Sequence, residues 1–152
     1  MKWFSINNDS QQKVNELRTG KEKLLTLTHH PTSGTIRIST RDEKRVFLFG
    51  REGFIRNRTV LRNEYGIRIG QISHEGGQIS QGNIEISGES FNYILQNVDP
   101  VKAAIYKDGD ILIVCELPEI SKSYTNNDND LLILTLCWYL VVAVKRQEEQ
   151  YA

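Results

Sequence analysis

The chain has 152 residues, of which 39% are hydrophobic and 25% charged, and its formal net charge is zero. This length and composition predict one globular domain with its own core and exclude a chain that is disordered throughout. The neutral balance argues against a nucleic-acid-binding protein, which needs a broadly basic surface. The first eight residues contain no apolar run of signal-peptide length, so we expect a cytoplasmic protein, with peripheral membrane attachment as an open alternative.

The charges are unevenly distributed along the chain. Residues 1–68 contain 14 Lys or Arg and 7 Asp or Glu, whereas residues 69–152 contain 5 and 12. The segment 37–68 is the most basic, with nine Lys or Arg against four acidic residues. Two interpretations stay open. In the plainer one the two halves interleave in the fold and cancel; in the other the fold keeps a basic side.

The first expected element is a short surface helix at about residues 10–19. Asp9 or Ser10 suits its N-cap, Val14 and Leu17 lie three residues apart, and Gly20 follows as a stop signal. The segment is short and weakly amphipathic.

After residue 22 the pattern is that of short strands separated by turns. The turn Asn63–Gly66 predicts pairing between strands over Phe54–Arg62 and Ile67–Ile72. The dipeptide Asp108-Gly109 is the strongest hairpin signal. We expect roughly nine to eleven antiparallel strands, a pattern typical of a barrel or a sandwich.

The last predicted element is an apolar helix over Leu131–Val144, within limits of about 130–146. An acidic, Asn-rich segment (126–130) precedes it and a basic pair (145–146) follows, which suits the two ends of a helix dipole. All of its faces are apolar, so it belongs in a protein core or in a bilayer. Fourteen residues span about 21 Å against about 30 Å of hydrocarbon, which favours the core. We therefore predict an α+β, mainly β fold, in which an antiparallel barrel wraps around this helix.

This order of elements resembles the tubby C-terminal-like superfamily, which includes tubby proteins, phospholipid scramblases and LURP-one-related proteins. The resembling parts are Asp128–Val144 and the strand sequence from Gly82 to Tyr93. The resemblance implies a sheet that closes as a barrel around a central hydrophobic helix. It also implies binding of phosphoinositide headgroups by basic residues, as in tubby proteins, or membrane and calcium binding, as in scramblases.

Candidate binding residues come from the basic segment. Arg56, Arg58 and Arg62 have the same parity, so an uninterrupted strand places them on one face. Arg37 and Arg68, on other strands, extend this set. Guanidinium groups bind phosphate oxygens in a bidentate manner. These five arginines are therefore candidate ligands of an anionic headgroup, with a solvated outer face of the barrel as the plainer interpretation.

Other chemistry finds little support. Asp128 and Asp130, with the Asn residues before them, offer oxygen ligands for calcium, but they lack the spacing of an EF-hand, and helix capping explains them. His29 and His30 are adjacent, so on a strand they point to opposite faces and do not form a zinc site. Cys115 and Cys137 lie in apolar runs and are expected to be buried thiols rather than nucleophiles or acylation sites. We predict no metal and no cofactor.

These observations predict a non-enzymatic binding module of tubby-like fold that docks an anionic membrane lipid or a protein partner, and no nucleic acid. Three alternatives stay open: a structural, protein-interaction barrel without a lipid ligand, a tail-anchored membrane protein, and an enzyme with an unrecognised pocket.

Overall fold

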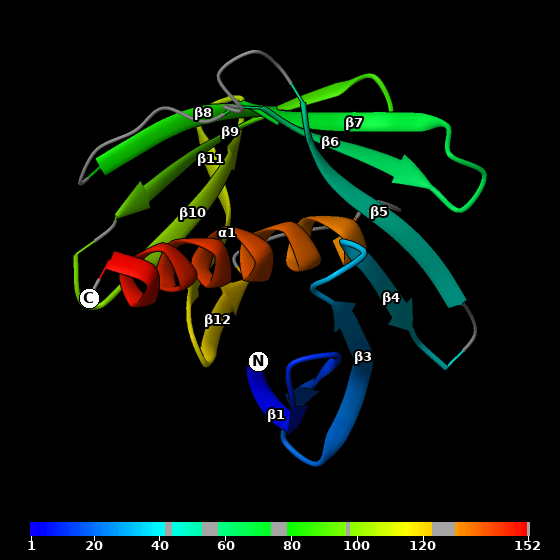
Figure 1. Cartoon of the computed structure of the whole chain (residues 1–152). Helices are drawn as coiled ribbons and strands as arrows, with labels where there is room; N and C mark the ends of the chain where they lie inside the picture. Colours follow the sequence, from blue (N-terminus) through cyan, green and yellow to red (C-terminus); the bar gives the residue numbers. More distant parts are fainter. Residues whose placement is uncertain (42–43, 53–57, 74–78, 97, 123–129, 152) are drawn as a thin grey trace.

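The computed structural model describes residues 1–41, 44–52, 58–73, 79–96, 98–122 and 130–151, which form twelve strands and one helix (Figure 1). The strands are β1 (Lys2–Asn8), β2 (Lys13–Thr19), β3 (Glu22–His30), β4 (Thr35–Ser39), β5 (Lys44–Glu52), β6 (Arg58–Asn63), β7 (Arg68–Ser73), β8 (Ile79–Ile86), β9 (Glu89–Gln96), β10 (Lys102–Lys107), β11 (Asp110–Glu116) and β12 (Glu119–Lys122). The helix α1 spans Asp130–Tyr151.

The twelve strands form one closed antiparallel barrel, in which each strand pairs with its neighbours in the sequence. The ring is completed where β1 pairs with β12 through Lys2 and Glu119. A backbone hydrogen bond from Trp3 N to the carbonyl oxygen of Pro118 (2.7 Å) supports this closure. The predicted antiparallel barrel is confirmed, and it is a closed ring.

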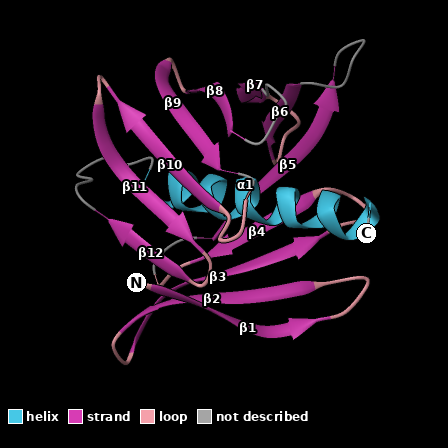
Figure 2. Ribbon diagram, turned by 90° about the vertical axis from the view of Figure 1, so that its left-hand side faces the viewer, coloured by secondary structure: helices cyan, strands magenta, loops and turns pink. Residues whose placement is uncertain are grey.

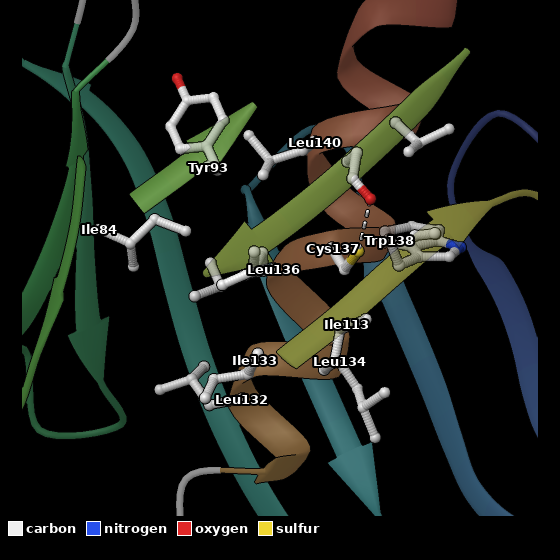
Figure 3. Close-up of a cluster of buried hydrophobic side chains, with 14 of the residues drawn as sticks. Ile84, Tyr93, Ile113, Leu132, Ile133, Leu134, Leu136, Cys137, Trp138 and Leu140 are labelled. Carbon is white, nitrogen blue, oxygen red and sulfur yellow. Dashed lines mark hydrogen bonds between the residues drawn. The ribbon is translucent and has the colours of Figure 1, made fainter. Parts of the chain in front are cut away.

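Helix α1 is enclosed by the strands (Figure 2). Leu136 and Trp138, which are two residues apart, leave the helix in opposite directions (Figure 3). The side chains of α1 that are at most 4% exposed are Leu132, Ile133, Leu134, Thr135, Leu136, Cys137, Trp138, Leu140 and Val141. The helix that we predicted from its all-round apolar sequence is therefore buried on every side, and the barrel supplies its contacts.

The helix is longer than predicted. It spans Asp130–Tyr151, whereas the sequence pattern limited it to Leu131–Val144, or about 130–146 at most. The predicted limit followed the change from apolar to polar residues after Val144. Lys, Arg, Gln and Glu have high intrinsic helix propensity, so the backbone continues for about two more turns beyond the apolar part.

The helix expected at residues 10–19 is wrong, because this segment contains strand β2. Asp9 does accept backbone hydrogen bonds, from Gln11 N (2.9 Å) and Gln12 N (2.7 Å), but these bonds stabilise the turn between β1 and β2. In the strand, Val14 and Leu17 lie on opposite faces, and Leu17 is buried opposite Leu25 of β3. The spacing of Val14 and Leu17 by three residues does not distinguish a helix from a strand. The segment forms a strand because it pairs with β1 on one side and with β3 on the other.

Other predicted features are confirmed. Asp108 and Gly109 adopt positive φ angles of 51° and 86° in the hairpin between β10 and β11, and Gly66 has a φ of 77° in the turn between β6 and β7.

The number of strands, twelve, exceeds the nine to eleven expected, because β1 and β2 lie in the N-terminal segment that we did not assign to the sheet. Residues 54–57 of the expected strand Phe54–Arg62 lie outside the described residues, and β6 begins at Arg58.

Candidate functional site

The outer face of β6 and β7 carries the closest pair of predicted site residues. Leu61 of β6 is buried inside the barrel, so Arg62 faces outward. A bulge shifts the register between Leu61 and Arg62, and this shift makes Arg68 of β7 the direct partner of Arg62. Partners on antiparallel strands have Cα atoms about 5 Å apart. The structure therefore brings these two arginines side by side.

Neutral oxygen atoms accept hydrogen bonds from both guanidinium groups. Arg62 Nη1 donates to the carbonyl oxygen of Gly66 (3.3 Å), and Arg68 Nη2 donates to Oε1 of Gln71. Gln71 Nε2 in turn donates to Oε2 of Glu85 on β8 (3.1 Å). Arg68 is exposed and Arg62 is partly buried. The pair is thus oriented by its neighbours and open to solvent at Arg68.

The other candidate arginines lie farther away. Arg58 is exposed at the start of β6, about 13 Å from Arg62 along the strand. Arg37 is exposed on the outer face of β4, two strands away and offset by two residues, which places its Cα about 12 Å from that of Arg62. Arg56 lies outside the described residues. The predicted set of five is therefore one close pair, Arg62 and Arg68, with two separate arginines on the same outer surface.

The strands divide into a basic arc and an acidic arc. Because strand order around the barrel follows the sequence, the two halves of the chain form two sides of the barrel and do not interleave (Figure 1). Strands β1–β7 contain eleven basic residues and three acidic ones: Lys2, Lys13, Arg18, Lys23, Arg37, Lys44, Arg45, Arg51, Arg58, Arg62 and Arg68 against Glu16, Glu22 and Glu52. Strands β8–β12 contain three basic residues and five acidic ones: Lys102, Lys107 and Lys122 against Glu85, Glu89, Asp110, Glu116 and Glu119. The interpretation in which the charges cancel by interleaving is therefore wrong.

A surface groove of about 450 Å³ adjoins the arginine pair. Arg68, Gln71, Glu85 and Glu89 contribute polar side chains to it, from β7, β8 and β9. Glu89 Oε1 also accepts a hydrogen bond from Nζ of Lys107 (3.1 Å). This groove was not predictable from the sequence, because Gln71 and Glu85 occupy ordinary outward positions of their strands.

Two cysteines and one histidine are buried in the described part of the chain. Cys115 and Cys137 are 0% exposed. Burial, and then the neighbouring thiol of Cys115, raise the pKa of Cys137 well above its ordinary value. A thiol that resists deprotonation is a poor nucleophile. His29 is 4% exposed inside the barrel, with its ring edge-on to Trp138 at 5.7 Å, whereas His30 faces the outer surface.

Among the described residues, no three His, Cys, Asp or Glu side chains form a group that could hold a metal ion. Asp128, which we considered as a calcium ligand, lies outside these residues. No helix in the described part of the chain is long and apolar enough to cross a membrane.

Comparisons with protein-family models, with curated proteins and with solved structures found no match. The class of protein is therefore defined by its own architecture, a closed twelve-strand barrel with a helix inside. The resemblance to the tubby C-terminal-like superfamily stays a prediction.

Proposed function

We propose that this protein is a non-enzymatic binding module of tubby-like fold that docks on anionic phospholipid headgroups at the Arg62–Arg68 pair. The closed barrel around a central helix supports the tubby-like part of this proposal. The basic arc supports the choice of an anionic ligand, because a surface of one sign attracts and orients a ligand of the opposite sign.

The observation that carries the proposal is the direct cross-strand pairing of Arg62 with Arg68 on the outer face. Like charges opposite each other on neighbouring strands are destabilising, by up to roughly 1 kcal/mol. A phosphate group between the two guanidiniums would offset this repulsion and accept hydrogen bonds from both.

The expected contribution of the pair to binding follows from membrane electrostatics. Each basic residue near an anionic membrane surface contributes about 1 kcal/mol. Replacing both arginines by glutamine should therefore weaken partitioning onto anionic vesicles by about 2 kcal/mol, which is a factor of roughly 30.

The test is co-sedimentation of wild-type protein and the double variant R62Q/R68Q with vesicles that contain phosphatidylserine. The matched control is K102Q/K107Q, which makes the same change in net charge on the acidic arc. These lysines form surface ion pairs with Glu116 (3.5 Å) and Glu89 (3.1 Å), and such pairs contribute little to stability. Strong loss of binding in R62Q/R68Q alone supports the proposal. Equal loss in both variants, or no loss in either, would contradict it.

A further inference from the structure

The turn between β6 and β7 exposes two large apolar side chains beside the arginine pair. Tyr65 is 80% exposed and Ile67 is 61% exposed, more than any other large hydrophobic side chain among the described residues. The turn lies at the right of Figure 1, at the end of the barrel where α1 begins. Exposed apolar side chains that lie together and are rimmed by polar residues are a feature of protein and membrane interaction sites.

The backbone of this turn is held by hydrogen bonds to one residue. Oδ1 of Asn63 accepts bonds from Tyr65 N (2.9 Å) and Ile67 N (3.0 Å), and the carbonyl oxygen of Asn63 accepts one from Gly66 N (3.0 Å). Three consecutive amide groups are thereby satisfied within the turn. Satisfied N–H groups lower the cost of moving a backbone into a medium of low polarity, so these bonds favour partial insertion of the turn.

The arginines lie close to the tip of the turn: Arg68 directly follows Ile67, and Nη1 of Arg62 donates to the carbonyl oxygen of Gly66. Arg62 and Arg68 flank the turn, each three residues from Tyr65, which corresponds to at most about 10 Å along the hairpin. Apolar side chains of interfacial elements enter the boundary between headgroups and acyl chains by a similar depth, about 5–10 Å. Tyrosine is well suited to this boundary, because its ring is apolar and its hydroxyl is polar.

Building on the proposed function, we infer that the Tyr65/Ile67 tip inserts into the headgroup–acyl boundary of an anionic bilayer while Arg62 and Arg68 contact the phosphates. The charge of the flanking arginines favours an anionic membrane over a neutral apolar groove on another protein. Glu64 is exposed at the same tip, and its carboxylate opposes approach to an anionic surface. Replacing Glu64 by Gln should therefore strengthen vesicle binding about fivefold. Unchanged or weaker binding of E64Q would overturn the inference.

Tyr65→Trp provides the direct measurement of insertion. The native Trp3 and Trp138 are 4% and 2% exposed, so their fluorescence in wild-type protein serves as a constant background. In Y65W bound to phosphatidylserine-containing vesicles, we expect a shift of the added emission to shorter wavelength and quenching by lipids brominated on the acyl chain. Binding of Y65W without shift or quenching would overturn insertion while leaving the proposed function intact. Absence of binding by wild-type protein would overturn both.

A second pair of variants tests the energetic role of the tip. Y65S/I67S should bind anionic vesicles roughly tenfold more weakly than wild type, since partial burial of large apolar side chains is lost. The control I94S/I111S replaces exposed apolar side chains on the opposite, acidic arc, which are 38% and 45% exposed. Thermal melting of each variant verifies the fold. Equal binding by Y65S/I67S and the control would overturn the inference.

Discussion

Alanine at Leu134 or at Leu136 is expected to destabilise the protein by about 3 kcal/mol in each case. The two side chains are 4% and 0% exposed. Since an α-helix turns by about 100° per residue, they point in directions about 160° apart, nearly opposite sides of α1. Truncation of a buried leucine to alanine costs about 2.7–5 kcal/mol, through lost transfer energy and the cavity that remains. A helix enclosed by a barrel must therefore show large effects at both positions.

The assay is urea unfolding followed by the fluorescence of the two buried tryptophans. With a slope of about 2 kcal/mol/M, a loss of 3 kcal/mol lowers the midpoint by about 1.5 M. Ile111→Ala, at a side chain 45% exposed on β11, serves as the control and should change the free energy of unfolding by less than about 0.5 kcal/mol. A small effect at either leucine would refute the reasoning, because it would mean that this side of the helix lacks packed neighbours.

Three further predictions concern single sites. Cys115 and Cys137 should react with a thiol reagent in native protein only as fast as the protein unfolds, and rapid labelling would contradict their burial. Hydrogen bonds from the backbone amides of Gln12 and Gln11 lower the pKa of Asp9 in the folded protein. The charged carboxylate therefore stabilises the folded protein above the unfolded pKa of about 4, and this contribution is lost as the pH falls through the folded pKa. The melting temperature of D9N should therefore lie below that of wild type at neutral pH and converge with it in acid; a constant difference would contradict this account. Gly82→Ala should destabilise by at least about 2 kcal/mol, because a Cβ there would overlap the carbonyl oxygen of Ser73 on β7, whereas Gly50→Ala meets no atom within 4 Å and should be nearly neutral in the same unfolding assay.

The sequence was informative where one pattern had one structural interpretation. The apolar segment 131–144 had no polar face and was too short to span a bilayer, which favoured an enclosed position, and the barrel followed from that requirement together with the short alternating strands. The segment 10–19 had no such pattern. The spacing of Val14 and Leu17 fits a helix. Only the pairing of this segment with β1 and β3, which lie outside it, decided that the segment is a strand.

The candidate site was predictable in part for the same reason. Parity placed Arg58 and Arg62 on one face, and both belong to the outer face of β6. The pairing of Arg62 with Arg68 depends on a bulge after Leu61, and nothing in the local sequence specifies that shift of register. The exposure of Tyr65 could not be predicted, because the alternation of buried and exposed positions in a strand does not extend into a turn.

The measurement that tests the central claim most directly is co-sedimentation of the wild-type protein with neutral and with anionic vesicles, at low and at high salt. The proposed docking by arginines predicts binding to anionic vesicles at low salt, strong reduction at high salt and little binding to neutral vesicles. Absence of binding at low salt, or equal binding to both kinds of vesicle that persists at high salt, would contradict it.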